Sequence, residues 1–404
     1  MKRKAEAGQA IASVALGLVV LTGIVGLAID MGYLRYEKRR MQAAADSAAI
    51  AGASELQYPT GNPAMAAKND SKVNGFEDGV NGVTVTPSNP PTDAPFSSIA
   101  NPTNYVEVKV HQNVPTYFMR IFGVNTTSLS ASAVARLGSS TGCVYSLNLA
   151  AGLTLAGNNL TAPNCGVVDN AVLDLGGGCI TASSIGVVLN LLGGCANPAP
   201  VIGIAPSADP LAYIAEPAVG ACLPNPNINQ PAAAPPVVLF PGTYCGITIQ
   251  PTNLAPVTFS PGLYVITGAP LQVQGASNVS GAGVTFYISD RSSVQITSTG
   301  NVNLTAPVNA VGAVPPIPGG VLFFQDRADL QPATITRPNL SLTGAVYFPG
   351  ALLTLSGNNS TQYLILVAQA MNFQGNIAIG SATTGNDYTS LPNGSPIKGA
   401  VLVQ

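Results

Sequence analysis

The sequence has few charged side chains and only one histidine. Of its 404 residues, 16 are Lys or Arg and 18 are Asp or Glu, so 8% are charged, against about 25% in ordinary soluble domains. The single histidine is His111, and there is no tryptophan. This composition excludes a basic nucleic-acid-binding surface and argues against most metal centres and against Ser/His/Asp or Cys/His catalysis. We therefore expect no nucleic-acid partner, no metal and no cofactor.

One long stretch near the N-terminus carries no charge at all. Residues 10–29 read AIASVALGLVVLTGIVGLAI. The basic residues that flank this run are Lys2, Arg3 and Lys4 before it and Arg35, Lys38, Arg39 and Arg40 after it. Twenty helical residues cover roughly the 30 Å hydrocarbon core of a bilayer, whereas a secretory signal would be shorter and followed by a cleavage site. The sequence predicts a retained membrane span, with the lipid bilayer as its partner through residues 10–29.

Six cysteines lie within about a hundred residues of one another. They are Cys143, Cys165, Cys179, Cys195, Cys222 and Cys245. The even number, the absence of CxxC spacing and the lack of a nearby histidine favour disulfides over a zinc site. Buried free thiols are the alternative. Six cysteines allow 15 pairings, among which we favour neighbours in sequence. Disulfides imply an oxidising compartment, and therefore a cytoplasmic N-terminus with the bulk of the chain outside the membrane.

The chain beyond the span is expected to continue as one helix. The stretch GLAIDMGYLRYEKRRMQAAADSAAIAGA has Asp-x-Gly just outside the span, an Arg-rich turn and a Gln-x-Ala-Ala-Asp-x-Ala-Ala block. In this combination it resembles the N-terminal segment of TadG-like and TadE-like proteins of the Flp (Tad) pilus-assembly systems. The resemblance covers residues 1–56, predicted to be a membrane anchor with a helical extension. It implies that Asp30 marks the membrane exit and contacts a neighbouring helix; a plain interfacial cap is the alternative.

Residues 57–138 are predicted to form a small membrane-proximal α/β unit. The stretch YVEVKVHQNV alternates as a half-buried strand, in which His111 is a surface residue without a catalytic partner. The following PTYFMRIFGVN suggests a short amphipathic helix. Its expected inward-facing residues are Tyr117, Phe118, Ile121 and Phe122. The order of elements also resembles the membrane-proximal part of TadE/TadG-like proteins.

Residues 139–404 contain an internal repeat. LTLAGNNLTAPNCGVVDN, starting at Leu153, aligns with LDLGGGCITASSIGVVLN, starting at Leu173, at an offset of 20 residues. This alignment places Leu155 over Leu175 and Gly166 over Gly186, and similar units recur up to residue 376 with periods in the low twenties. The Pro- and Ala-rich residues 196–241 break the period and are predicted to be a long loop between two stacks.

The repeat predicts a mainly β fold, a right-handed parallel β-helix (solenoid). One repeat cannot bury its apolar residues alone, whereas stacked repeats align leucines in a core and asparagines in hydrogen-bonded ladders. A β-sandwich is the alternative. The region also resembles the long extracytoplasmic parts of TadG-like proteins, in its segments PGLYVI, VLFFQDR and VYFPGALLTLSGN. With the N-terminus, this likeness spans nearly the whole chain.

An enzyme remains an alternative, because parallel β-helices include pectin-degrading enzymes. Such sites need clustered carboxylates, with basic residues for a lyase or an acid/base pair for a hydrolase. The best candidates are Asp326, Arg327 and Asp329, with Asp290 and Arg291 on a nearby repeat. The simpler interpretation of these residues, which we favour, is a solvated turn with local ion pairs. With so few carboxylates we expect no catalytic site and no enzyme activity.

Together these features predict a single-pass protein of the bacterial inner (cytoplasmic) membrane, with its bulk in the periplasm or outside the cell. The expected role is structural or adhesive, in a Flp/Tad-type pilus-assembly or surface-attachment system. Expected partners are pilus-assembly or other envelope proteins, further copies of the chain, and surface glycans. The alternative is a polysaccharide-binding or polysaccharide-degrading, pectin-lyase-like β-helix protein.

Overall fold

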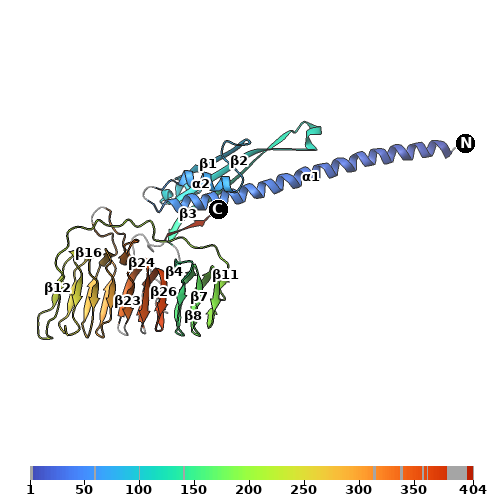
Figure 1. The fold of residues 1–404 in the computed structure, drawn as a ribbon. Helices are drawn as coiled ribbons and strands as arrows, with labels where there is room; N and C mark the ends of the chain where they lie inside the picture. Colours follow the sequence, from blue (N-terminus) through green and yellow to red (C-terminus); the bar gives the residue numbers. More distant parts are fainter. Residues whose placement is uncertain are drawn as a thin grey trace. The chain divides into compact units, whose positions relative to one another are not determined.

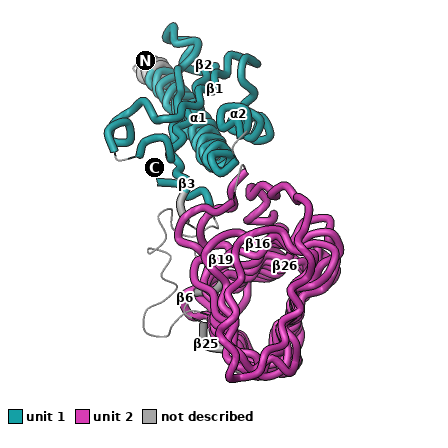
Figure 2. The backbone as a smooth tube through the Cα atoms, turned by 90° about the vertical axis from the view of Figure 1, so that its left-hand side faces the viewer, with its two compact units in different colours: residues 1–138, 398–404 teal, residues 139–397 magenta. Residues whose placement is uncertain are grey.

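The computed structural model describes residues 3–58, 61–99, 101–139, 142–312, 315–336, 340–356, 359–361, 363–379 and 398–403. The chain divides into two compact units, residues 1–138 with 398–404 and residues 139–397 (Figure 2). The first unit is an N-terminal helix with a small antiparallel sheet, and the second is a β-solenoid (Figure 1). The predicted mainly β solenoid fold is confirmed.

The described residues of the first unit form two α-helices, three short 3₁₀ helices and a four-stranded sheet. Its helices are α1 (Arg3–Glu55), α2 (Pro63–Val73), η1 (Phe96–Ser98), η2 (Pro102–Asn104) and η3 (Met119–Phe122). Its strands, in the order in which they lie in the sheet, are β1 (Val83–Ser88), β2 (Tyr105–Pro115), β3 (Thr126–Ser139) and β28 (Lys398–Leu402).

The environment of helix α1 differs between its N-terminal and C-terminal parts. Its apolar N-terminal part has exposed side chains on almost every side, whereas its C-terminal part buries a stripe of five alanines and one methionine. The stripe contains Met41, Ala44, Ala45, Ala48, Ala49 and Ala53, and it packs in one core with Val106, Val108, Val110, Ala131, Ala133 and Ala135 of the sheet. Because alanine side chains are small, they let the helix lie close to the sheet. The three valines belong to the strand that the sequence predicted, and they face the helix on one side of it.

The segment after β2 differs from its predicted structure. It forms the tip of the antiparallel β2–β3 hairpin, with a single 3₁₀ turn at η3 in place of a helix. The four residues expected to face inward are instead exposed by 55%, 40%, 80% and 70%; they are Tyr117, Phe118, Ile121 and Phe122. Gly123 has a left-handed φ of 85° and ends η3, and Pro115 already pairs with Thr126. The hairpin therefore closes before a longer helix can form.

The solenoid is built from short parallel strands. Its N-terminal strands are β4 (Gly142–Ser146), β5 (Leu153–Thr154), β6 (Leu160–Asp169), β7 (Val172–Asp174), β8 (Cys179–Val187), β9 (Asn190–Leu192), β10 (Cys195–Asn197) and β11 (Val201–Ile202). The next eight strands along the chain are β12 (Val237–Leu239), β13 (Gly242–Tyr244), β14 (Ile247–Ile249), β15 (Val257–Phe259), β16 (Gly262–Thr267), β17 (Leu271–Val273), β18 (Val279–Ala282) and β19 (Val284–Ser289). The remaining strands are β20 (Val294–Ile296), β21 (Val302–Thr305), β22 (Val321–Gln325), β23 (Ala333–Thr336), β24 (Leu340–Ser356), β25 (Asn359–Thr361), β26 (Tyr363–Phe373) and β27 (Ile377–Ile379).

The order of strands in space differs from their order in the chain. The chain enters in the middle at β4 and winds to one end at β11, and the later strands start at the opposite end with β12 (Figure 1). They wind back until β26 pairs in parallel with β4 and β5, and β27 with β6. The two predicted stacks thus form one continuous solenoid.

The prediction of a long loop at residues 196–241 between two stacks is wrong in both the length and the path of the loop. The predicted range contains β11 and β12 and the end of β10. The segment between β11 and β12 leads from one end of the solenoid back to the other (Figure 1), and isolated bridges pair Leu223 with Tyr244 and Ile228 with Ile249. It therefore does not lie between two stacks, since the stacks meet at β4 and β26.

The C-terminal boundary also differs from the expected one. The predicted β-helix region extends to residue 404, but β28 joins the sheet of the first unit beside β3. The backbone N–H of Val403 donates to the carbonyl oxygen of Val134 at 2.8 Å. In chain order, the solenoid is therefore an insertion between two neighbouring strands of the small sheet.

The 20-residue register is confirmed over part of the repeat. Leu160 pairs with Ile180 and Thr154 with Asp174, each at this offset. The register then shifts after Ala162, so that Gly166 lies beside Ser184 and not beside Gly186. Residues 163–165 of β6 face a shorter segment of β8 at this corner, which the periodic alignment did not anticipate.

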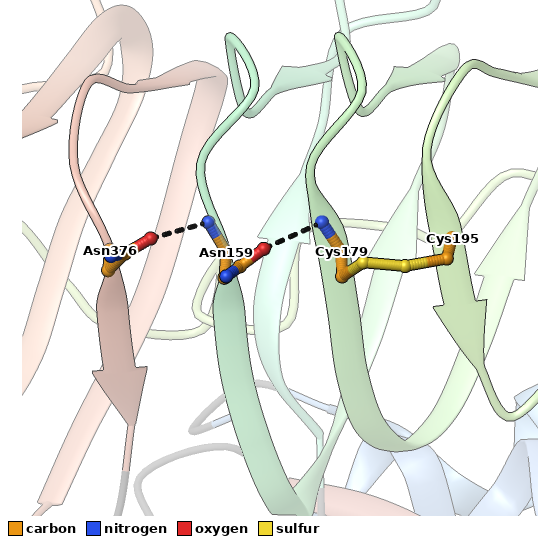
Figure 3. The surroundings of a disulfide bond; sticks show 4 residues. All are labelled: Asn159, Cys179, Cys195 and Asn376. Atoms are coloured by element: carbon orange, nitrogen blue, oxygen red, sulfur yellow. Dashed lines mark hydrogen bonds between the residues drawn. A yellow bond between two sulfur atoms is a disulfide. The ribbon is translucent and has the colours of Figure 1, made fainter.

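Side chains of one kind stack from rung to rung, where a rung is one complete turn of the solenoid. Tyr264, Phe286 and Phe323 form one buried aromatic column, with successive ring centroids 5.4 and 5.3 Å apart. Asparagines form ladders at the turns (Figure 3): Asn376 Oδ1 accepts the backbone N–H of Asn159, whose own Oδ1 accepts that of Cys179, both at 2.9 Å. The first of these bonds crosses the junction between the early and late strands.

Candidate functional site

Asp30 is a buried carboxylate at the end of the apolar run of α1. Its Oδ1 accepts the backbone N–H of Tyr117 at 2.9 Å, and its Oδ2 accepts those of Phe118 and Met119 at 2.8 and 2.6 Å. The side chain is 0% exposed. Three N–H donors on one carboxylate offset the cost of burying its charge. Asp30 therefore holds the tip of the β2–β3 hairpin against the helix.

A second contact between the helix and the hairpin lies one turn closer to the N-terminus. Gly26 is the one buried residue between Ser13 and Ile29. A Cβ atom at this position would lie 2.6 Å from Cδ1 of Phe118, so the phenylalanine ring occupies the space that glycine leaves free. Gly26 and Asp30 are four residues apart and share one face of the helix.

Sequence reasoning identified Asp30 but not its partner or the role of Gly26. The resemblance implied a contact with a neighbouring helix, and within this chain the contact is with the hairpin. The available signal was the i, i+4 spacing of a glycine and an aspartate in an apolar run, which predicts a narrow docking face. The segment that docks there lies about 90 residues later in the chain, and the spacing of Gly26 and Asp30 does not indicate which segment it is.

The second candidate site is the acidic turn after β22. Asp326 Oδ1 accepts the backbone N–H of Ala328 at 2.8 Å, and Asp329 Oδ1 accepts that of Gln331 at 3.0 Å. Each carboxylate therefore stabilises its own turn. Burial raises the pKa of the Asp329 carboxyl above its usual range, and the nearby charge of Asp326 adds to this effect.

Arg327 points to a different part of the solenoid. Its Nη1 lies 3.1 Å from Oε1 of Glu216 in the segment between β11 and β12. Its Nη2 donates to the backbone oxygens of Leu211, Ala212 and Ile214 at 3.2, 3.2 and 2.8 Å. Arg327 therefore fastens the segment between β11 and β12 to the solenoid. The sequence-based interpretation of a turn with local ion pairs is wrong for Arg327, because its ionic partner lies in this distant segment.

The two aspartates, but not Arg327, line an open cleft of about 630 Å³. Asp290 and Arg291 also line it, as the sequence analysis suggested for a nearby repeat. In the part of the chain that the structure describes, no three His, Cys, Asp or Glu side chains are arranged to hold a metal ion. The cleft offers carboxylates to a ligand, while the guanidinium of Arg327 is engaged elsewhere.

The six cysteines form three disulfides between neighbours in sequence, as favoured. The pairs are Cys143–Cys165, Cys179–Cys195 and Cys222–Cys245. Cys179 lies directly across from Cys195 in the β8–β10 pair (Figure 3), so this disulfide ties one rung to the next. Each closed loop of roughly twenty residues contributes about 3 kcal/mol to stability in the chain-entropy model.

One helical segment of the described chain, Ser13–Glu55, contains a window long and apolar enough to cross a membrane, with a mean hydropathy of 2.3. Residues 8–55 match the family model described as putative Flp pilus-assembly TadE/G-like, and residues 38–135 match that described as putative Tad-like Flp pilus-assembly. No curated protein and no solved structure matches the chain. The matched region contains α1, Asp30, the small sheet up to β3 and the hairpin tip. Residues 8–135 of the chain are therefore similar to TadE/G-like and Tad-like Flp pilus-assembly proteins.

Proposed function

We propose that the protein is a membrane-anchored structural or adhesive component of a Flp/Tad-type pilus-assembly or surface-attachment system. The observation that carries the proposal is the continuity of α1, whose apolar half runs without a break into a packed Tad-like unit. That unit carries a solenoid inserted between two of its strands. An anchor joined to a long repetitive surface suits a role in holding or contacting other molecules.

We place the anchor in the bacterial inner membrane as a single span, with a cytoplasmic N-terminus. The three disulfides support this orientation, because such bonds persist in the periplasm or outside the cell and are rare in the cytosol. The solenoid would then be available to pilus-assembly or envelope proteins, to further copies of the chain, or to surface glycans.

The position of the solenoid in the chain suggests a direct test in the source bacterium. Residues 142–397 can be replaced by a short Gly/Ser linker, because β3 and β28 are neighbours in the small sheet. In a strain lacking the protein, we expect the full-length chain to restore pili and surface attachment. The shortened chain should remain in the membrane but fail to restore attachment. Normal pili and normal attachment in the strain lacking the protein would contradict the proposed role.

We propose further that the protein is not an enzyme. The main support is that Arg327, the basic member of the candidate trio, is bonded to Glu216 and three backbone carbonyls and does not line the cleft. A polysaccharide-degrading activity is the alternative, because the cleft is lined by Asp290, Asp326 and Asp329 and also by the basic residue Arg291.

Incubation of the purified protein with acidic polysaccharides, with and without calcium, distinguishes the two. We expect no unsaturated or reducing sugar ends to form. Product that forms with the wild-type protein and is lost in the folded Asp326→Ala, Asp329→Ala double variant would contradict the non-catalytic proposal. Binding without turnover would instead identify a glycan-binding surface.

A further inference from the structure

The hairpin tip presents a cluster of apolar side chains that remain largely exposed among the described residues of the first unit. Ile121 is 80% exposed, Phe122 70%, Phe118 40% and Val124 38%. These four residues define the apolar tip. Soluble surfaces carry single exposed apolar residues, but a cluster of two phenylalanines with two aliphatic residues marks an interaction site.

The contacts of the tip with α1 fix its height relative to the apolar run. Phe118 packs on Gly26, which lies inside residues 10–29 and four residues before Asp30. At 1.5 Å per residue, this contact lies about 4.5 Å inside the end of the run at Ile29. Figure 1 shows the β2–β3 hairpin extending alongside α1 towards its N-terminal end. The apolar tip is thus continuous with the exposed apolar surface of the helix itself.

The backbone of the tip is largely paired within the protein. Asp30 accepts three of its N–H groups. The N–H groups of Ile121, Gly123 and Val124 donate to carbonyl oxygens within the tip at 3.1, 2.9 and 3.2 Å. Such internal pairing is the condition for backbone to enter hydrocarbon. The one charged residue of the tip, Arg120, is exposed and has a side chain long enough to reach the headgroups.

We infer that the apolar tip enters the bilayer beside α1, in the leaflet from which the helix continues into the small sheet. The inference rests on the proposed membrane anchor. The partner that covers the tip is the lipid of the bilayer that the helix crosses, because the tip and the membrane span form one apolar surface and lie at the same depth. The anchor then consists of a helix and a hairpin wedge, joined at Gly26 and Asp30.

The absence of tryptophan from the chain allows a direct measurement. Phe122→Trp places a single tryptophan on the apolar tip of the full-length protein, reconstituted in vesicles of phosphatidylethanolamine and phosphatidylglycerol. We expect its emission to be blue-shifted and to lose most of its intensity when the phospholipids carry bromine on their acyl chains. Ile121→Trp serves as a second variant at the most exposed position of the tip, and it should behave in the same way.

Two further single-tryptophan variants separate the possible outcomes. Ile24→Trp, 58% exposed on the span, should be quenched if the helix crosses the membrane, and Val73→Trp, 85% exposed on α2, should remain unquenched and water-like. Quenching at Ile24→Trp without quenching at either tip variant would overturn the inference and leave the anchor intact. Blue-shifted but unquenched tip variants would mean that protein covers the tip, which also overturns it. No quenching at Ile24→Trp would overturn the proposed anchor as well.

Discussion

Replacing Leu175 with aspartate is expected to unfold the rungs at the β11 end of the solenoid. Leu175 is 0% exposed, and its Cβ lies 2.6 Å from where a Cβ on Gly194 would be, so the side chain has no route to water. A carboxyl group at this place has no hydrogen-bonding partner among the stacked leucines. We expect a loss of about 3–5 kcal/mol in the free energy of unfolding of these rungs.

Hydrogen exchange measures this loss rung by rung. The amide of Leu175 donates to the carbonyl oxygen of Leu192, and that of Leu155 to the carbonyl oxygen of Asp174, both at 2.9 Å. Both amides should exchange much faster in Leu175→Asp, while amides of the rungs around β16 and β19 change little, because each rung of a solenoid contacts only its neighbours. Thr181→Ser, on the half-buried side of β8, is the control and should leave exchange unchanged. Wild-type protection in the aspartate variant would show that the register is wrong.

Replacing Arg327 with alanine is expected to release the segment between β11 and β12. Its ion pair with Glu216 is about one-third exposed on both sides and contributes roughly 1 kcal/mol or less. The larger effect comes from the carbonyl group of Ile214, a buried residue of the solenoid core, which loses its donor, whereas the carbonyl oxygen of Leu211 still accepts the backbone N–H of Ile214 at 3.0 Å. A buried carbonyl without a partner costs about 1–3 kcal/mol. We therefore expect a total loss of about 1–4 kcal/mol.

Limited proteolysis of the purified protein tests this expectation, because cleavage between residues 203 and 236 should become several times faster in Arg327→Ala. Arg327→Lys should restore part of the protection, since an ammonium group cannot reach all four acceptors at once. Arg291→Ala is the matched control, because Arg291 is an exposed arginine of the solenoid that lines the cleft and is not bonded to the segment between β11 and β12 in any contact described above. Equal cleavage rates in Arg327→Ala and the wild-type protein would mean that the segment is held by its other contacts, such as the buried Leu211 and Ile214.

Sequence patterns predicted the features that depend on neighbouring residues or on repetition. Stacked rungs require like side chains above one another, so the alignment of Leu160 with Ile180 is visible in the sequence and holds in the structure. Disulfides between successive rungs join cysteines about one period apart, which makes neighbours in sequence the natural pairs.

Features that depend on the course of the chain could not be predicted in this way. A parallel ladder is the same at every junction, so no pattern indicates that β26 pairs with β4. Arg327 and Glu216 are 111 residues apart and meet only because the long segment returns along the solenoid. At the hairpin tip, the spacing of Phe118, Ile121 and Phe122 is the same whether the side chains pack inward or face a lipid or partner.

The entry of the chain into the middle of the solenoid has a consequence for its synthesis. The strands β4 to β11 emerge first and can stack, but their edge at β4 stays unpaired until Leu366 and its neighbours arrive to pair with Val144. These residues are roughly 220 positions later, which corresponds to about 10–40 s at the usual rates of translation. During this interval the nascent protein displays an open parallel edge, a template for association with other chains.

The nascent protein is therefore expected to depend on a chaperone that covers this edge until the late strands have been synthesised. Once β26 and β27 arrive, the edge is sealed by backbone pairing and by the asparagine bond from Asn376 to Asn159. The late strands thus cover the exposed edge of the early strands. A chain truncated before residue 363 would keep this edge unpaired and would remain prone to associate with other chains.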